Sequence, residues 1–367
     1  MPRFRRPVLA RPALGRTALS RRRFLAGSAA VGISLKLPKG AFAEGGKVNF
    51  YNWDTYIGES TIENFEEETD IEVQYDLFAD NAELFAKLRG GNPGYDLIVP
   101  TNDYVERLIE AELLLSLDHS KIPNIENIDP AFMDVAFDPG REYSLPYMWG
   151  TIGIGYRKSA VDAPPESWED LLASDRYAGR IALLSEPTTV LQMAMKAQGN
   201  SLNDWSDENL AAAEKMLIEQ KPRITAFAPD NGQDLLLAGE VDLAMEWNGD
   251  IQQIMEEDDD IGYVLPKEGG LRWEDTLAIP VGAQNVENAH VLINYLLDAE
   301  VGAEIADFIQ YATPNAAAKA LMGEEYTANP VIFPSDEAMQ NSETAVAPTQ
   351  EQMQKIDEAW TRIKASS

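Results

Sequence analysis

The sequence predicts an α/β fold arranged as two lobes joined by two crossing strands. Strand-like and helix-like segments alternate from about residue 47 onward, and two long extended stretches, 144–156 and 273–280, interrupt the alternation. Once an N-terminal signal is set aside, roughly 324 residues remain, which is more than one hydrophobic core usually supports. We therefore expect two lobes, a hinge made of the two extended stretches, and a cleft between the lobes.

Residues 1–43 have the layout of an export signal. They hold ten Arg and Lys and no acid, then an apolar stretch at 24–37 and the small-x-small site AFA at 41–43. The apolar stretch is shorter than the roughly 20 residues that a membrane span needs. SRRRFL at 20–25 resembles the twin-arginine export signal, which a receptor recognises. The alternative is a chance arginine pair in an ordinary secretory signal. Either way, we expect cleavage after residue 43 and a periplasmic protein.

The charge of the remaining chain excludes several classes of partner. All 61 Asp and Glu follow Ala43, together with only 20 of the 30 Lys and Arg, so the net charge of this part is near −41. Such a charge repels nucleic acid and anionic membranes and attracts cations over a distance. A cationic ligand therefore suits the composition. The alternative is an acidic surface that serves solubility in a saline habitat.

Cysteine and histidine usage excludes other chemistry. The chain has no cysteine, which rules out thiol catalysis, disulfides and thiolate zinc sites. His119 and His290 are too few for a histidine-rich metal site, and we expect both to be structural or exposed. No metal or cofactor is predicted.

The first lobe begins with a strand at 47–53. Ser60 and Glu63 have the spacing of a capping box, which predicts a helix through residue 68. A second strand at 71–75, a helix at 83–89, a third strand at 95–99 stopped by Pro100, and a helix at 104–111 follow. This order predicts a parallel sheet with helices on both faces.

The second lobe repeats the alternation after the first extended stretch. We expect a strand at 181–184, helices at 190–197 and 208–219, and a strand at 241–245. SWEDL at 167–171 is typical of a capped helix start, so Trp168 is predicted to be structural. Helices near 290–297 and 300–310 rejoin the first lobe, and a helix at 351–363 ends the chain. Lobe 1 is thus assigned to 44–150 plus 274–319, and lobe 2 to 151–273 plus 320–367.

Aromatic residues and acids recur where the predicted strands end. Ligands of open α/β sheets bind beyond the carboxyl ends of the strands. Aromatic rings attract cations, and carboxylates accept hydrogen bonds from ammonium groups, so this combination suits an alkyl chain that carries ammonium groups. The segments are WDTY at 53–56, TNDY at 101–104, SEPTT at 185–189, MEWNGD at 245–250, WED at 273–275, and Tyr311.

Each of these residues also has a structural alternative. Trp53 and Trp247 could be core residues, and Asp54 and Asp103 could be helix N-caps, which acids after a strand often are. Asp250 could favour the start of its helix through the helix dipole. The acidic run at 256–260 is predicted to be a solvated face.

The chain resembles the periplasmic spermidine/putrescine-binding proteins over essentially its whole length after residue 43. No single matching segment is specific, but their order and spacing are. The segments are YNW at 51–53, YDLIVP at 95–100, LPYMWG at 145–150, WNG at 247–249, PKEGG at 266–270, DTLAIP at 275–280 and YATPN at 311–315.

This resemblance implies a type II-like periplasmic binding protein fold and a role in transport. The family's members are substrate-binding proteins of ABC importers that hold putrescine or spermidine between their lobes and deliver it to a membrane permease. We therefore expect a monomer that is not an enzyme, with no nucleic-acid partner. The alternatives are the same fold with another amine, an amino-acid derivative or a metal chelate, and, more remotely, an exported hydrolase with paired carboxylates. No nucleophile elbow or metal motif supports a hydrolase.

The family's ligand site is carried over onto matching residues. Aromatic walls correspond to Trp53 and Tyr56 in the first lobe, and Asp275 is the best candidate for gripping an ammonium group. Further matches are Trp247, Trp273, Tyr311, Asp250, which resembles a carboxylate of the putrescine-preferring branch, and Glu186, which aligns with an acid of the spermidine-preferring branch.

Four positions depart from the family pattern. Thr55 stands where relatives have an acid, with Asp54 one position earlier, and Thr189 stands where a glutamate is normal. Thr101 replaces a serine, and Asp103 replaces an aromatic or small residue. We expect Asp54 or Asp103 to take the place of the missing acids, which leaves open the amine that is preferred.

Overall fold

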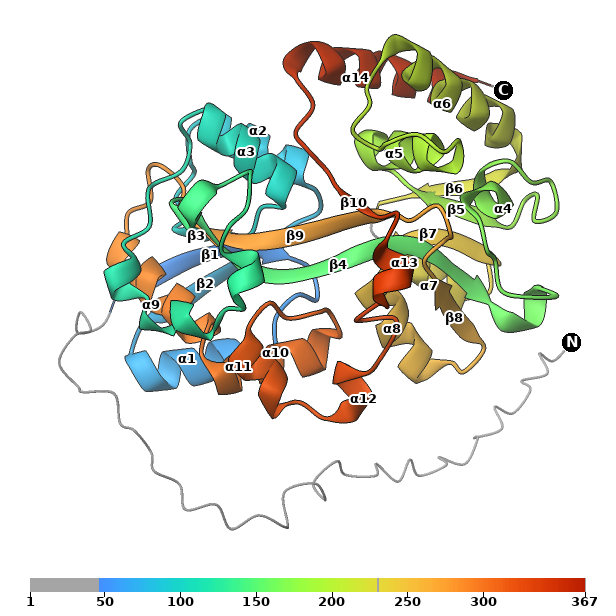
Figure 1. Ribbon diagram of the computed structural model, residues 1–367. Coiled ribbons are helices and arrows are strands. Elements are labelled where there is room, and N and C mark those ends of the chain that lie inside the picture. The colour runs from blue at the N-terminus through green and yellow to red at the C-terminus, as the bar shows by residue number, and fades with distance from the viewer. Residues whose placement is uncertain (1–45, 230, 367) are drawn as a thin grey trace, which may run out of the picture. The chain divides into compact units, whose positions relative to one another are not determined.

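The computed structural model describes residues 46–229 and 231–366 (Figure 1). The predicted signal and its cleavage site lie outside the described residues. Over the described residues, no helix is both long and apolar enough to cross a membrane.

Two long strands, β4 (Ser144–Arg157) and β9 (Leu271–Ala278), form the centre of a sheet with the order β2-β1-β3-β9-β4-β7-β5-β6. Residues 144–151 of β4 pair with β9, whereas residues 152–156 pair with β7, so β4 passes from one part of the sheet to the other. These are the two stretches that the sequence predicts as crossing strands.

Both flanks of the sheet are parallel, whereas β9 pairs antiparallel with β3 and β4 at its centre. β1 (Lys47–Trp53) pairs in parallel with β2 (Glu72–Phe78) and β3 (Leu97–Ile98) on one flank. On the other flank β5 (Ile181–Leu184) pairs in parallel with β6 (Ile224–Ala228) and β7 (Leu243–Trp247). The parallel pairing predicted for the first lobe is therefore confirmed for β1, β2 and β3. Between the two flanks, β9 runs antiparallel to β4, as a strand that crosses back must.

Helices cover both faces of the first flank, as predicted (Figure 1). Ser60 precedes the first of them, but its side chain makes no capping hydrogen bond, so the predicted capping box is not formed. The helices are α1 (Thr61–Thr69), α2 (Asn81–Arg89), α3 (Asn102–Glu110), α9 (Val286–Leu296), α10 (Ala299–Ile309) and α11 (Ala316–Leu321).

The second flank is covered in the same way (Figure 1). Ser167 and Asp170 form the predicted cap of the first helix there, and Trp168 is fully buried with its indole N–H donating to the Gly269 carbonyl at 2.8 Å. The helices are α4 (Trp168–Leu172), α5 (Pro187–Ala197), α6 (Asp207–Gln220), α7 (Gly232–Leu237), α8 (Asn248–Glu257) and α14 (Gln350–Ala365).

The segment between α11 and α14 contains elements that the sequence analysis did not predict. It forms α12 (Glu324–Thr327), α13 (Asp336–Met339) and β10 (Glu343–Thr344), a short strand parallel to β9. The strand β8 (Ile261–Val264), which pairs with β4, was also missed. These elements are too short to show a clear hydrophobic period.

Both histidines have structural partners, as predicted. His290 is buried and its Nε2 accepts a hydrogen bond from the Asp118 amide at 3.0 Å. His119 Nε2 lies 2.8 Å from the Arg141 carbonyl oxygen.

Candidate ligand-binding site

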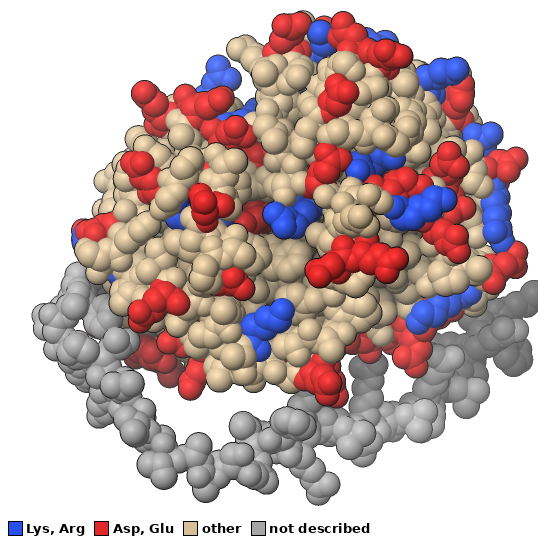
Figure 2. All heavy atoms as spheres, in the orientation of Figure 1, with Lys and Arg blue, Asp and Glu red and all other residues tan. Residues whose placement is uncertain are grey.

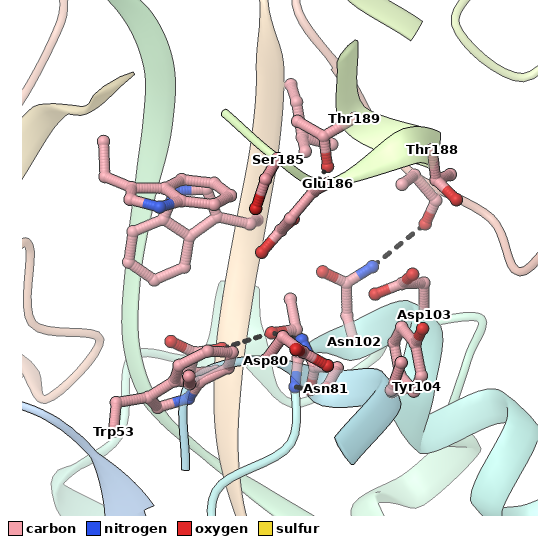
Figure 3. Close-up of a pocket in the computed structure, with 18 of the residues that line it drawn as sticks. Trp53, Asp80, Asn81, Asn102, Asp103, Tyr104, Ser185, Glu186, Thr188 and Thr189 are labelled. Carbon is pink, nitrogen blue, oxygen red and sulfur yellow. Dashed lines mark hydrogen bonds between the residues drawn. The ribbon is translucent and has the colours of Figure 1, made fainter. Parts of the chain in front are cut away.

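A cavity of about 260 Å³ lies where the flanking strands end beside the crossing strands. Its walls come from the starts of α2 and α3 on one side and of α5 and α8 on the other, with β9 between them. Figure 3 shows Trp53, Asp80 and Asp103 below the space and Glu186 and Thr189 above it. The cavity thus lies at the carboxyl ends of the strands, the position expected for an α/β sheet.

Edge-to-face aromatic rings form one continuous wall of this cavity. Trp247 packs against Trp273 at 5.8 Å between ring centroids, and Trp273 packs against Tyr311 at 5.2 Å. Tyr311 in turn contacts Tyr56 at 5.4 Å. Trp53 is fixed separately, because its indole N–H donates to the Val99 carbonyl at 2.9 Å. Rings held in this way offer flat apolar surfaces with negative faces, which suit a cationic alkyl chain.

Two glycines allow the aromatic wall to approach the neighbouring backbone. A Cβ at Gly249 would lie 2.5 Å from the Tyr311 ring, and one at Gly150 would lie 2.6 Å from Cζ2 of Trp273. Real Cβ atoms do not approach so closely, so a side chain at either position would displace a ring of the wall. Both glycines belong to segments that carry the family resemblance.

Asp275 is the buried carboxylate at the base of the cavity. It is only 6% exposed, and its Oδ1 accepts a hydrogen bond from the Thr101 hydroxyl at 2.7 Å. Thr101 is itself held by Asn81, whose Nδ2 donates to the same hydroxyl oxygen at 2.8 Å. Burial raises the pKa of Asp275 from 3.8 to about 7, while the Thr101 and Tyr56 hydroxyls oppose that rise. The ionised form of this carboxylate is therefore stabilised by any cation that binds next to it.

Polar atoms around the cavity are buried without a hydrogen-bond partner. They are the Tyr56 hydroxyl, Nε1 of Trp273 and Nε2 of Gln192. The Tyr56 hydroxyl lies near enough to Asp275 to lower the pKa of that acid, although the two groups do not meet the geometry of a full hydrogen bond. Buried polar groups without hydrogen-bond partners are rare, and here they indicate a space in which a polar ligand or water can supply the partners.

Four helices begin at the cavity, and each carries an acid at its cap or in its first turn. Asp80 caps α2 by accepting from the Glu83 amide at 2.7 Å, and Glu186 stands at the cap position of α5. Asp103 lies in the first turn of α3 and Asp250 in that of α8. Helix N-termini are partly positive and commonly bind anions. Here the protein's own carboxylates occupy those ends, so the cavity favours cations.

Among the described residues that line the cavity, six are acids and none is Lys, Arg or His. The other two acids are Asp54 and Asp275. By contrast, acids elsewhere are spread over the visible face of the molecule rather than gathered in one patch (Figure 2). The local excess of carboxylates, and not the net charge alone, makes the cavity electrostatically favourable for positive charge.

The structure brings together all but one of the residues predicted for the site. Thr55 is the exception: it is exposed, does not line the cavity, and adopts a left-handed backbone with φ of +50°. The predicted residues that line the cavity are Trp53, Asp54, Tyr56, Thr101, Asp103, Glu186, Trp247, Asp250, Trp273, Asp275 and Tyr311.

Sequence reasoning missed several further lining residues. Asp80 had a detectable signal, because it stands three residues before Glu83 at a helix start. Asn81 and Gln192 had none, since a polar residue within a helix is ordinary until its neighbours in space are known. The helix-cap alternative fails for Asp54, which lies in a turn, and for Asp103, since Thr101 takes the cap position of α3.

The fold and the cavity define a class: two-lobed binding proteins that hold a solute between lobes joined by crossing strands. Comparison with known proteins places the chain within that class. Residues 60–334 match the family model of bacterial extracellular solute-binding proteins. The chain is 37% identical over 327 residues to the spermidine/putrescine-binding periplasmic protein of Escherichia coli K12, covering 88% of this chain and 92% of that protein.

Two further relatives agree. The putrescine-binding periplasmic protein SpuD of Pseudomonas aeruginosa is 34% identical over 337 residues, covering 87% of this chain and 92% of SpuD. The crystal structure of the spermidine/putrescine ABC transporter substrate-binding protein PotD from Streptococcus pneumoniae superposes with a TM-score of 0.76 at 32% identity, covering 87% of this chain and 98% of PotD. The chain belongs to the bacterial extracellular solute-binding protein family, in company with its spermidine/putrescine-binding members.

Proposed function

We propose that this protein is the substrate-binding component of an ABC importer, and that it captures a polyamine such as putrescine or spermidine in its cavity. The observation that carries the proposal is the lining itself, which over residues 46–229 and 231–366 combines a continuous aromatic wall with six acids and no basic residue. An anionic solute would meet repulsion from these carboxylates, and a neutral one would leave the buried Asp275 without a cation. The names of the relatives support the same ligand class.

The energetics are sufficient for useful affinity. A cation over an aromatic ring gains about 0.5–2 kcal/mol, and a hydrogen bond to a charged group gains about 1.5–3 kcal/mol. Three rings and two carboxylates therefore supply roughly 5–12 kcal/mol before ordering costs, and micromolar binding needs about 8 kcal/mol. Several methylene groups against the rings add the burial of apolar surface.

The finer assignments complete the proposal. The protein is exported to the periplasm through the twin-arginine signal at 20–25, acts as a monomer, and is a transport receptor rather than an enzyme. Its lobes, 44–150 plus 274–319 and 151–273 plus 320–367, close on the amine, and the closed form docks on a membrane permease.

A ligand screen by thermal melting tests this function. A ligand that binds only the folded protein raises Tm, by an amount that grows with the logarithm of its excess over Kd. Putrescine, cadaverine, spermidine or spermine is expected to raise Tm, whereas glucose and glutamate are not. Calorimetric titration with the four amines then ranks them. A protein whose melting responds to glutamate or glucose, and to no amine, would contradict the proposal.

A further inference from the structure

Asn81 lines the cavity at the start of α2, next to the capping residue Asp80, and reaches Asp275 through Thr101 (Figure 3). Its Oδ1 accepts a hydrogen bond from the Thr101 amide at 3.2 Å, and its Nδ2 donates to the Thr101 hydroxyl oxygen at 2.8 Å. The Thr101 hydroxyl in turn donates to Oδ1 of Asp275 at 2.7 Å. Hydrogen bonds therefore connect the start of α2 to the carboxylate at the base of the cavity.

The directions of these hydrogen bonds all follow from one group that cannot change its role. A backbone N–H is only a donor, so the Thr101 amide requires the side-chain oxygen of Asn81 on its side. The side-chain nitrogen of Asn81 then faces the Thr101 hydroxyl, and because that nitrogen is only a donor, the hydroxyl oxygen must accept. The single hydroxyl proton is left for Asp275. Asn81 thus fixes the direction in which the Thr101 proton points.

The backbone around Thr101 is held to β9 by contacts that do not involve Asn81. Thr101 and Asp275 form an antiparallel bridge, and the Thr276 amide donates to the Pro100 carbonyl at 3.0 Å. The Thr276 hydroxyl donates to the same carbonyl at 3.0 Å. A change of the Asn81 side chain should therefore leave the Thr101 hydroxyl beside Asp275 and alter only the direction of its proton.

We propose that Asn81 is a positioning residue for ligand binding: by directing the Thr101 proton at Asp275, it keeps that carboxylate in the ionised form that binds an ammonium group. This inference rests on the proposed function and deepens it. A hydrogen bond donated to a carboxylate stabilises its ionised form over the protonated acid. Burial raises the pKa of Asp275 to about 7, and the Thr101 hydroxyl makes the largest opposing contribution. If that proton pointed elsewhere, fewer molecules would have an ionised Asp275 at neutral pH.

Other titratable groups also act on Asp275 or respond to it, and they come from several elements around the cavity. Their contributions are the same in the wild type and in the variants below, so they cancel when the proteins are compared. These groups are Tyr56 after β1, Asp103 on α3, Tyr147 on β4 and Glu274 on β9.

Asn81→Asp tests the inference, because the new side chain still accepts from the Thr101 amide but replaces the Nδ2 donor by an acceptor. The Thr101 proton then turns toward position 81 and away from Asp275. Calorimetry measures the affinity for putrescine at pH 7 and at pH 8.5. The wild type should bind about twofold more weakly at pH 7, where half of Asp275 is protonated. The variant has lost a hydrogen bond that favours the ionised form about tenfold, so it should bind about eightfold more weakly at pH 7 than at pH 8.5.

A double-mutant cycle shows whether Asn81 acts through Thr101. Thr101→Val removes the hydroxyl and should give about the same eightfold ratio. Adding Asn81→Asp to Thr101→Val should then change the ratio no further. Asn64→Asp, on α1 and not part of the cavity lining, adds the same charge and should keep the wild-type ratio. In the empty proteins, ¹³C NMR of the Asp275 carboxyl carbon, assigned with Asp275→Asn, should show a higher pKa in Asn81→Asp than in the wild type.

The outcomes separate this inference from the proposed function. If the wild type binds no amine, the proposed function itself fails. If it binds putrescine and Asn81→Asp keeps the twofold ratio, the function stands and the positioning role is overturned. Equal losses at both pH values would overturn it as well, because Asn81 would then contact the ligand directly. A wider ratio when Asn81→Asp is added to Thr101→Val would also overturn it, since the added charge would then act without Thr101.

Thermal melting confirms that each variant folds. If Asn81→Asp does not fold, Asn81→Ala takes its place, because it also removes the Nδ2 donor and allows the Thr101 hydroxyl to turn away from Asp275. Its ratio should exceed that of the wild type, and an unchanged ratio would overturn the inference.

Discussion

Glu274 and Asp275 are neighbours on β9, yet their carboxylates have different partners. Because successive side chains of a strand point to opposite faces, the two acids face different surroundings. Glu274 accepts a hydrogen bond from Nη2 of the fully buried Arg141 at 2.5 Å. Asp275 has the neutral hydroxyl of Thr101, and no Lys or Arg nitrogen comes within 4 Å of it over residues 46–229 and 231–366.

This difference indicates that Glu274 is a structural carboxylate, whereas Asp275 is available to bind a cationic ligand. Burial raises the pKa of both acids, but Arg141 opposes the rise at Glu274. The charge of Glu274 is compensated within the fold, so its contribution is to fix β9 against the loop that carries Arg141. The charge of Asp275 is compensated only by hydroxyls, so the protein gains most when a cation arrives.

Breaking the internal pair should have the largest effect. Arg141→Met leaves the Glu274 carboxylate buried without its partner, and the free energy of unfolding is expected to fall by about 3–5 kcal/mol. Urea unfolding of the empty protein at pH 8 measures it. The matched control is Arg176→Met, whose partner Asp162 is exposed, with an expected change within about 1 kcal/mol. Adding Glu274→Gln to Arg141→Met should recover part of the loss, and equal stability of Arg141→Met and the wild type would contradict this account.

Removing the charge of Asp275 should affect binding rather than folding. Asp275→Asn keeps the shape but loses the charge-assisted hydrogen bond, so affinity for putrescine and spermidine should fall at least tenfold by calorimetry. The empty variant should be more stable than the wild type at pH 8, because the folded wild type then carries an ionised Asp275 whose pKa is raised above the unfolded value of 3.8. Unchanged affinity would refute the role assigned to this carboxylate.

Much of the fold could be predicted because its elements are long and regular. β4 was recognisable as a long extended stretch with glycines, β9 as a second extended stretch, and α14 as a final helix. The second extended stretch was predicted to cross back, but its pairing with β3 and β4 was not, because local periodicity does not show which strands lie side by side. β3 proved to be only two residues long, although the predicted strand spanned five, because only Leu97 and Ile98 are in register with neighbours.

Most of the site could be predicted because acids and rings stand directly after strands. The helix-start and ligand interpretations of these acids are compatible: Glu186 stands at a helix cap and lines the cavity as well. The prediction that Thr55 lines the cavity is not met, because Thr55 lies in a turn with a left-handed backbone and is exposed to solvent. The neighbouring residues in the sequence do not predict that backbone conformation. Gln192 could not be predicted as a lining residue, because the lack of a hydrogen-bond partner for its Nε2 depends on three-dimensional packing.

The smallest of the expected effects is a dependence of affinity on pH, and it bears directly on the contrast between the two acids. In the empty protein Asp275 has a pKa of about 7, and an ammonium ligand lowers it, so binding below pH 7 requires loss of a proton. Affinity for putrescine should be constant above pH 8 and about tenfold lower at pH 6, since the ligand stays protonated throughout. Asp103, with a pKa of about 6, should add a further loss toward pH 5.

Calorimetry in buffers of different ionisation enthalpy measures the protons released. We expect nearly one proton per ligand at pH 6 and almost none at pH 8, and Asp275→Asn should abolish most of this release while Glu274 contributes none. The stability of the empty protein should change with pH in the opposite sense to the affinity. Because the pKa of Asp275 is raised on folding, the folded state binds more protons than the unfolded state between about pH 4 and 7. The contribution of Asp275 to stability therefore decreases as the pH rises through that window. An affinity that stays constant from pH 8 to 6 would mean that the ligand does not contact the ionised Asp275. In that case the difference between Glu274 and Asp275 would have no role in ligand binding.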